Sequence, residues 1–593
     1  MTTPELTSMR NLVAESINKY DLVIVGGGLA GMTAGVRALE LGLRVAVLEK
    51  GEGKIYPCNT RQSGGVMHIG FLDPYRPAED LDAVIDQRSG GEADKALSSV
   101  LSKTGGRFLD WLQDNGARFI KFNEQEGYRW CMAPPRSLRA GIDWQGRGPD
   151  VILRGLVERF GELGGSFHGA TRAKSLVMKE RQCVGVLVEK NGIHETVNAA
   201  QVLISDGGFQ ANPELYREHI GAGFERIFQR GARTGMGDGL KMGITAGAAV
   251  KGAERFYGHV LCRDALHNDN VWPYPEIDGI ATAGMVVNGA GQRIADEGIS
   301  GVYLTNALAG ALAAAPDDEP LYAIFDAAIW DKPGRSARIP ANPLLEEAGG
   351  TVLRANSLED LAALAGVASP GLVETVSQYN AALAAGELDR LAMPRSTAMQ
   401  PWPITKAPFM AIPVCPGITY TMGGVAIDAH AQVLAENGNP IKGLLAAGAA
   451  TGGIEGGSQA GYIGGLMKAG VFGMIAAERA AFLCGKPMSN GLKDKVGASG
   501  LPPPLASSNI AVSAPPRPHR LAKYPMLRAI VGFGIPVAIL LSVVVAGLVL
   551  WLCWSSLDII AIPIAGLAGM VSAVVALSYA ELVRLVTDMM MPE

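Results

Sequence analysis

The chain has 593 residues, of which 48% are hydrophobic and only 18% are charged, so we expect two or three domains with much of the chain buried. The net charge of −5 gives no electrostatic basis for binding nucleic acid, and the 76 glycines follow no three-residue period, which excludes a collagen-like fibre. The seven cysteines form no CxxC pair, and neither HExxH nor CxxCH occurs, so we expect no metal site, iron–sulfur cluster or attached haem.

The first elements of the chain predict a nucleotide-binding unit. The first twenty residues are polar and lack the apolar core of a secretory signal. Residues 21–25 then predict a buried strand, 29–42 a helix and 44–49 a second strand. A strand, helix and strand in about thirty residues indicate parallel pairing. Residues 201–206 predict a further strand of the same sheet.

The later part of the chain changes in composition. Aromatic residues, prolines and loop signals dominate from about 240 to 400, and glycine-rich strand and helix signals return after 405. We predict a nucleotide-binding domain in two parts, over residues 1–240 and 401–490, with an α+β domain inserted over residues 241–400. A Pro/Ser/Ala-rich linker over 491–526 and a C-terminal hairpin over 527–583 follow.

The predicted hairpin consists of two apolar runs. Ala529–Trp554 holds 26 residues and Ile559–Ala580 holds 22, all without charge, and each run is long enough to cross a bilayer as a helix. Lys523 and Arg528 precede the first run, Arg584 follows the second, and the loop between them has no Lys or Arg. We therefore expect a membrane-anchored protein whose large domains face the cytoplasm, with a buried helical pair as the alternative.

A dinucleotide fingerprint opens the first predicted helix. Gly26, Gly28 and Gly31 satisfy GxGxxG between a strand and a helix, where the backbone can approach a pyrophosphate. Glu49 ends the next strand 21 residues after Gly28 and can accept hydrogen bonds from a ribose. FAD and NAD share this unit. A second glycine-rich approach at 442–448 favours the more extended cofactor, FAD.

Eight segments carry a family resemblance, in matching order over residues 20–485. They are DLVIVGGGLAG (21–31), VAVLEK (45–50), NTRQSGGVMH (59–68), SDGGF (205–209), GMGDGLKMGITAGAA (235–249), VVNGAGQRIADE (286–297), TYTMGGVAID (419–428) and GLLAAGAATGGIEGGSQAGYIGG (443–465). With these the chain resembles the fumarate reductase/succinate dehydrogenase flavoproteins, among them soluble fumarate reductases, tricarballylate dehydrogenase and 3-ketosteroid dehydrogenases. The resemblance implies a Rossmann-like FAD domain with an inserted capping domain that closes over the flavin.

The resemblance also implies which residues bind FAD. For the adenosine half they are Gly26, Gly28, Gly31, Glu49, Lys50, Asp206 and Gly207. For the pyrophosphate and flavin they are Thr60, Arg61, Ser63, Gly64 and Gly65, and for the ribitol and isoalloxazine Gly448, Gly464, Gly465 and Leu466. Backbone N–H groups near Leu466 would stabilise negative charge on the reduced flavin.

Arg293 is the first catalytic candidate that the resemblance implies. It matches the arginine with which fumarate reductases protonate the substrate carbon, and Asp296 and Glu297 could relay the proton. An arginine ordinarily stays protonated, so this role needs burial beside such a relay. The alternative is a salt-bridged arginine of the capping domain.

Three further candidates are His259, Tyr420 and Tyr462. His259 falls near the histidine that grips a substrate carboxylate, Tyr420 takes the place of a second substrate histidine, and Tyr462 resembles a tyrosine at the substrate edge of the flavin in ketosteroid and tricarballylate dehydrogenases. Either tyrosine could hydrogen-bond a carbonyl or carboxylate. Packing alone is the alternative for all three residues.

The chain also departs from the fumarate reductase pattern. The segment 458–461 holds no Arg or Lys where that pattern has a carboxylate-clamping arginine, which argues against a fumarate-sized dicarboxylate. Ala449 replaces a glutamate that contacts the ribitol. The histidine that attaches flavin covalently is absent, and although Cys58 lies in that area we expect non-covalent FAD.

These observations predict a dehydrogenase or reductase acting on a carbon–carbon bond next to a carbonyl or carboxylate. Because haem and cluster motifs are absent, we expect electrons to pass to quinone or a membrane partner. Two alternatives stay open: a membrane-bound ketosteroid or lipid-like ketone dehydrogenase, and a non-catalytic flavin subunit of a membrane complex. The substrate and the physiological direction are not specified by these patterns.

Overall fold

The computed structural model describes residues 20–486 except 123–125, 138, 142–143, 273 and 317–318. The expected linker (491–526) and hairpin (527–583) lie outside the described residues. Among the residues that are described, no helix is both long and apolar enough to cross a bilayer.

The first sheet carries the predicted βαβ unit. Its main path runs β18 (Gln432–Leu434), β19 (Pro440–Ala446), β9 (Ile193–Ile204), β1 (Tyr20–Val25), β2 (Val45–Leu48) and β6 (Ser166–His168). All neighbouring pairs are parallel except β18 with β19. The strand expected at 21–25 is found as β1, and the strand at 201–206 is the end of β9. Its carboxyl edge therefore gathers the residues that follow β1, β2 and β9.

Strand β9 changes partners along its length. Its first half pairs antiparallel with β8 (Gln182–Lys190), which in turn pairs with β7 (Arg172–Lys179). From Ala199 onward it pairs in parallel with β1. The buried second half, from Val202 to Ile204, therefore anchors the sheet in the core.

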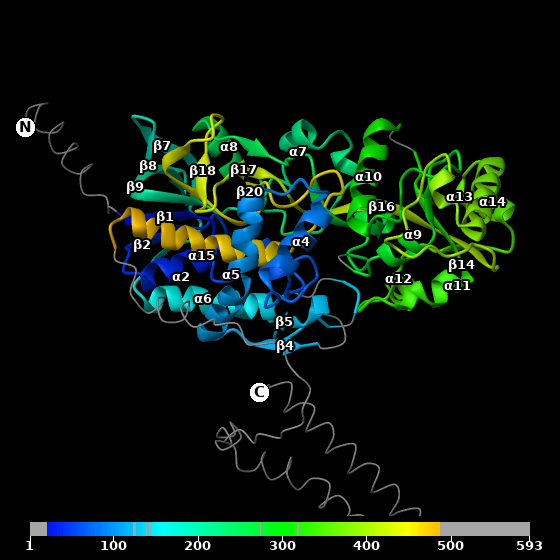
Figure 1. The fold of residues 1–593 in the computed structure, drawn as a ribbon, viewed down its shortest axis with the longest axis horizontal. Coiled ribbons are helices and arrows are strands. Elements are labelled where there is room, and N and C mark those ends of the chain that lie inside the picture. The colour runs from blue at the N-terminus through cyan, green and yellow to red at the C-terminus, as the bar shows by residue number, and fades with distance from the viewer. Residues whose placement is uncertain are drawn as a thin grey trace, which may run out of the picture. The chain divides into compact units, whose positions relative to one another are not determined.

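Helices cover this sheet and supply much of the first core. The helix that follows β1 is α2 (Leu29–Glu40), and the long helix α15 (Gly465–Leu483) packs against it although it lies more than 400 residues later. Figure 1 shows α15 and α2 beside each other, with α5 (Lys95–Asp114) and α6 (Gly148–Glu162) next to them. The apolar residues of these helices join β1 and β2 in one hydrophobic core.

A second sheet has its own core. Its strands are β10 (Phe228–Gln229), β12 (Phe256–Cys262), β13 (Met285–Val287), β14 (Tyr322–Asp326), β15 (Leu353–Ala355) and β16 (Phe409–Thr421). Its helices are α9 (Asp278–Ala283), α10 (Gly301–Ala314), α11 (Ala327–Asp331), α12 (Ala341–Glu347), α13 (Leu358–Ala365) and α14 (Ser369–Ala385). A separate hydrophobic cluster fills this part. Because β10 precedes residue 240 and β16 follows residue 400, the second sheet draws on both sides of the predicted insertion.

The remaining helices are short: α3 (Asn59–Gln62), α4 (Ala78–Ser89), α7 (Pro213–His219) and α8 (Asp238–Thr245). Two small sheets are formed by β11 (Val250–Lys251), β17 (Gly424–Ala426) and β20 (Thr451–Gly452), and by β3 (Val66–Met67), β5 (Trp130–Met132) and β4 (Phe119–Lys121).

Candidate active site

The fingerprint turn joins β1 to α2. Gly26 has φ +101°, a left-handed conformation that favours glycine, and a Cβ on Gly31 would lie 2.0 Å from the Gly26 carbonyl oxygen. Thr60 Oγ1 accepts the Leu29 N–H over 3.0 Å at the start of α2. The turn is therefore closed tightly onto the helix, and the backbone at Gly28 has open space before it except for Thr60.

Acidic residues follow the neighbouring strands. Glu49 is 7% exposed, and its two carboxylate oxygens accept the N–H groups of Gly27 (2.8 Å) and Gly51 (2.7 Å). Lys50 forms an ion pair with Asp238 at 3.2 Å. The carboxylate of Asp206 accepts the Gly239 N–H over 2.8 Å with one oxygen. Burial raises the pKa of Asp206 to about 6.

A cavity of about 580 Å³ begins at this edge and extends to β12 and β16. Most of the residues expected to bind the cofactor line it: Gly26, Gly28, Glu49, Lys50, Thr60, Ser63, Gly64, Gly65, Asp206, Gly207, Gly448, Gly465 and Leu466. Gly31, Arg61 and Gly464 do not line it. Segments far apart in sequence thus supply one continuous binding surface.

The cavity offers groups that suit FAD. Two residues that line it carry a buried oxygen, Asp206 Oδ1 and Gln62 Oε1, that has no hydrogen-bond partner among the residues that the structure describes. At Gly64 and Gly207 a Cβ would meet no atom within 4 Å, so the backbone faces open space. The N-termini of α2 and α15 both border the cavity and present N–H groups to anionic parts of a ligand. Unpaired acceptors, bare backbone and two helix ends fit a dinucleotide that carries a pyrophosphate.

Tyrosines form the end of the cavity at β12 and β16. The antiparallel pairing of β12 with β16 places Tyr257 opposite Tyr420. The ring of Tyr462, which precedes α15, stacks on Tyr257 with centroids 3.8 Å apart and an interplanar angle of 15°. All three side chains line the cavity. Tyr420 and Tyr462, expected from the sequence, are therefore brought together with a tyrosine that was not.

Tyr420 is connected to a buried ion pair. Its hydroxyl donates to Glu455 Oε1 over 2.8 Å, and Lys468 Nζ lies 3.2 Å from Glu455 Oε2. Burial, reinforced by Glu455, raises the pKa of Tyr420 well above its ordinary value. Since its single proton is committed to Glu455, Tyr420 can offer the cavity only an acceptor oxygen.

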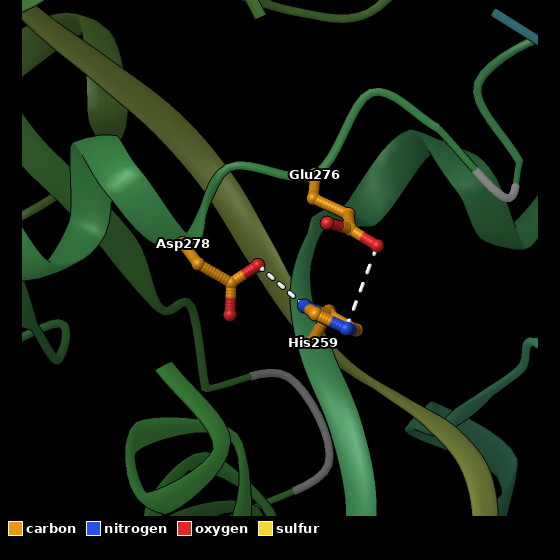
Figure 2. Close-up of side chains that lie close together, drawn as sticks. All are labelled: His259, Glu276 and Asp278. Carbon is orange, nitrogen blue, oxygen red and sulfur yellow. Dashed lines mark hydrogen bonds and ion pairs between the residues drawn. The ribbon is translucent and has the colours of Figure 1, made fainter. Parts of the chain in front are cut away.

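His259 lies in a cluster of charged groups at the same end. Figure 2 shows it between the carboxylates of Glu276 and Asp278, at 3.5 Å and 3.0 Å. Arg230, 6% exposed, pairs with Glu276 at 2.7 Å. The ligand atoms of His259, Glu276 and Asp278 lie within 4.8 Å of one another, a spacing that a metal ion could use. Because an arginine cation already occupies Glu276 and both ring nitrogens of His259 have protein partners, we interpret the cluster as a hydrogen-bond network.

Comparison with known proteins identifies the family to which the chain belongs. Residues 21–464 match the model of a family described as an FAD binding domain. The chain belongs to this FAD-binding family.

Curated relatives and solved structures agree with that membership. A cytochrome-type fumarate reductase of Shewanella frigidimarina is 27% identical over 487 residues, which cover 78% of this chain and 77% of the relative. A 4-oxocyclohexanecarboxylate 2-dehydrogenase of Sinomonas cyclohexanicum is 24% identical, covering 77% of this chain and 91% of the relative. The structure of a 3-ketosteroid Δ1-dehydrogenase from Sterolibacterium denitrificans superposes with a TM-score of 0.61 at 19% identity, covering 78% of this chain and all of that one, and so shares the fold.

The chain is thus an FAD-dependent oxidoreductase of the fumarate reductase family that acts on carbon–carbon bonds. This function excludes a purely non-catalytic flavin subunit.

Two arginines expected in the site of this oxidoreductase lie away from the cavity. Arg293 forms an ion pair with Glu297, which is fully buried, and donates to the Met393 carbonyl over 2.6 Å. All three guanidinium nitrogens of Arg293 donate to groups of the second sheet's part of the chain. The structure therefore favours a salt-bridged arginine over an arginine that protonates the substrate. Arg61 is likewise fully buried, paired with Asp150 and packed over the Tyr56 ring.

Several cavity residues were missed from the sequence, above all Tyr257, Arg230 and Glu276. Tyr257 had a usable signal, because it stands two residues before His259 in a strand and therefore on the same face. Arg230 and Glu276 had none, since each reaches the cavity from a loop whose course depends on the packing of the second sheet.

Proposed function

We propose that this oxidoreductase transfers hydrogen between FAD and a carbon–carbon bond next to a carbonyl, in a cyclic ketone that carries a carboxylate. The observation that supports this most directly is the meeting of Tyr257, Tyr420 and Tyr462 at one end of the cavity. Of the three, Tyr462 can donate a hydrogen bond to a ketone oxygen, and a tyrosine hydroxyl can exchange a proton with the neighbouring carbon. The stacked rings offer a flat apolar surface for a ring-shaped substrate.

A cation for the carboxylate is available in the same cavity. Arg338 lines it and lies over the rings of Phe122 (4.4 Å) and Tyr128 (5.7 Å). Among the described residues Arg338 has no carboxylate partner, in contrast to Arg230, which is neutralised by Glu276. A guanidinium in an aromatic setting that pairs with no carboxylate in the described part of the chain is suited to a ligand carboxylate. Arg338 would therefore bind the substrate carboxylate, for which the segment 458–461 supplies no arginine or lysine.

The relatives support this class of substrate. The Sinomonas cyclohexanicum relative acts, by its name, on 4-oxocyclohexanecarboxylate, which combines a ring, a ketone and a carboxylate. The Shewanella frigidimarina relative reduces fumarate, which has no ring. When bound, FAD supplies or accepts the hydride, and the protein residues handle the proton and hold the carbonyl.

An anaerobic bleaching assay tests the proposal. Purified, yellow protein is mixed with 4-oxocyclohexanecarboxylate, 4-androstene-3,17-dione or succinate, and dithionite-reduced protein with fumarate or acrylate. We expect 4-oxocyclohexanecarboxylate to bleach the flavin absorbance fastest, and R338M to weaken its apparent affinity at least tenfold. Fastest bleaching by the steroid would favour a ketosteroid dehydrogenase, and reoxidation by fumarate alone would return the chain to dicarboxylate chemistry.

We further propose that the electrons are exchanged with quinone at a membrane. This proposal is supported by the apolar runs Ala529–Trp554 and Ile559–Ala580 alone. Alkaline carbonate washing of membranes should leave the full chain in the pellet, and a short-chain quinone should reoxidise the reduced flavin faster than oxygen does. Release of the chain into the wash would contradict the anchor, and slow reoxidation would contradict the quinone.

A further inference from the structure

Three side chains form a continuous hydrogen-bonded path that leads away from the cavity. Tyr257 and His259 project from the same face of β12, and Tyr257 Oη lies 2.8 Å from His259 Nε2. On the other side of the ring, His259 Nδ1 lies 3.0 Å from Asp278 Oδ2 at the start of α9. The other oxygen of Asp278 accepts the Val260 N–H over 3.3 Å.

The path has a defined polarity. A carboxylate is an acceptor, so Asp278 places a proton on Nδ1 of His259. In the neutral ring Nε2 then carries a lone pair that faces the Tyr257 hydroxyl. Tyr257 and His259 line the cavity, whereas Asp278 does not, so the path connects the cavity to a half-buried carboxylate behind His259.

The other histidine of the cavity cannot act in this way. Nδ1 of His68 accepts the Phe71 N–H over 3.0 Å, and the ring of His68 stacks on that of Phe71 at 4.4 Å. Burial lowers the pKa of His68 to about 3, so it stays neutral. Only His259, of the two, combines a phenol on one nitrogen with a carboxylate on the other.

We propose that Tyr257, His259 and Asp278 form a proton relay, in which the Tyr257 hydroxyl exchanges the proton of the substrate carbon next to the carbonyl. The relay rests on the proposed function. In dehydrogenation that C–H bond breaks, its electron pair stays on carbon to form the C=C bond, and its proton goes to Tyr257 Oη. The proton of Oη moves at the same time to His259 Nε2. The second hydrogen leaves the adjacent carbon with its electron pair, for which FAD is the acceptor. Reduction runs the same transfers backward.

The relay explains how a buried tyrosine could accept a proton from the substrate. Burial, with Tyr462 and Glu276 nearby, raises the pKa of Tyr257 well above its ordinary value, although Arg230 acts in the opposite direction. Tyr257 alone therefore stays protonated and cannot take up a further proton from the substrate. Passing its own proton to His259 avoids a buried phenolate, and Asp278 stabilises the imidazolium that results.

The charged and titratable side chains that face His259 in the described part of the chain come from its own strand and from the segments packed against it. Tyr257 lies on its own strand, Glu276 and Asp278 precede and begin α9, and Arg230 stands beyond Glu276. The facing residue on β16 is Gly417, and the start of α10 places Gly301 against Asp278. The pH response of the relay therefore depends on this one set of groups.

The first test needs no substrate. Full-length holoprotein labelled with ¹⁵N-histidine is studied by long-range ¹H–¹⁵N spectroscopy, with His259 assigned by its loss in H259Q. We expect the neutral ring to carry its proton on Nδ1, and Y257F and D278N each to shift the His259 signals. H267Q and D269N, at exposed positions eight and ten residues after His259 in the chain, should leave the His259 signals in place. A neutral ring protonated on Nε2, or a stoichiometric metal ion detected by mass spectrometry and displaced by H259Q, would overturn the relay.

The second test follows proton transfer without oxidation. Dithionite-reduced holoprotein is incubated with 4-oxocyclohexanecarboxylate in D₂O, and deuterium next to the ketone is measured by mass spectrometry against a protein-free blank. We expect Y257F to slow exchange about 100-fold or more, and H259Q less, with D269N and H267Q unaffected. In D278N the acidic limb of the pH profile should move to lower pH, because an amide stabilises the protonated imidazole less than a carboxylate does.

Native exchange rates in Y257F would overturn the relay, as would an unchanged pH profile in D278N. G301A is a further variant, which keeps all three side chains of the relay. The added Cβ would lie 2.3 Å from Asp278 Oδ1 and must displace that carboxylate. G301A should resemble D278N in pH profile. Because the spectroscopic test involves no substrate, it separates a failure of the relay from a failure of the proposed function.

Discussion

Single buried charges decide much of the stability around the cavity. Glu455 and Lys468 have side chains 0% and 2% exposed, and Lys468 Nζ also donates to the carbonyls of Thr451 and Met422. The pair fixes Tyr420 and joins α15 to β20. Removing one partner would leave the other charge buried without compensation.

K468M should therefore lower the free energy of unfolding by about 3–5 kcal/mol. The matched control is R354A, because the Arg354–Glu346 pair is bonded at 2.7 Å but its side chains are 36% and 42% exposed. R354A should cost less than about 1 kcal/mol. Urea unfolding followed by tryptophan fluorescence measures both, and equal losses would contradict the assigned role of burial.

Asp206 gives the cofactor-free protein a predictable pH dependence. Burial holds its folded-state pKa near 6, above the ordinary value of 3.8, so the folded chain binds this proton more tightly than the unfolded chain does. The stabilisation that comes from this tighter proton binding is fully present below pH 3.8 and is lost as the pH rises through about 6. It amounts to on the order of 3 kcal/mol. D206N should remove that slope.

The measurement is the unfolding free energy of apoprotein at several pH values between 4 and 7, compared between native chain and D206N. Lys50 and Asp238 lie near Asp206 and are the same in both proteins, so they cancel in the difference. Parallel curves for the two proteins would show that Asp206 does not titrate in this range.

At the scale of elements, the turn between β1 and α2 depends on contact between backbones. A Cβ at Gly31 would meet the Gly26 carbonyl oxygen at 2.0 Å, and the backbone cannot yield without opening the turn. Gly155 in α6 is a contrasting helical glycine, because a Cβ there would meet nothing within 4 Å.

G31A should lose most of its bound flavin, whereas G155A should keep it and gain about 0.5–1 kcal/mol, as Ala is the better helix former. Flavin absorbance per protein after gel filtration, with urea unfolding of G155A, checks both outcomes. Full flavin content in G31A would mean that the turn tolerates rearrangement.

At the scale of the whole molecule, two hydrophobic cores border one cavity. A ligand that binds only the folded chain stabilises it by mass action, by about 2.7 kcal/mol at a concentration 100 times its dissociation constant. Adding FAD to apoprotein should thus raise the thermal midpoint, progressively with concentration. Riboflavin, which lacks the pyrophosphate and adenosine, should raise it much less, and equal effects would contradict the binding of the adenosine half at Glu49 and Asp206.

Much of the first sheet could be predicted from the sequence because its signals are local. The strands of the βαβ unit, the fingerprint glycines and Glu49 follow from patterns within thirty residues, and short apolar runs with glycine turns leave few alternatives. The family resemblance added the distant glycines near α15, and 13 of the 16 expected cofactor residues line the cavity. The other three are Gly31, Arg61 and Gly464. The burial of Arg61, like the pairing of the catalytic candidate Arg293 with Glu297, is not visible in a motif.

The sequence by itself determined the nucleotide-binding unit, the cofactor class and two of the cavity tyrosines. Only the tertiary structure decided the opposite end of the cavity, where Tyr257 and Glu276 meet His259 and Arg230 pairs with Glu276. Those contacts join residues from a strand and from loops of irregular course, and their geometry is set by how the second sheet packs. No period or spacing along the chain encodes such a meeting, since hydrogen-bond partners are chosen by three-dimensional distance and by exclusion of water.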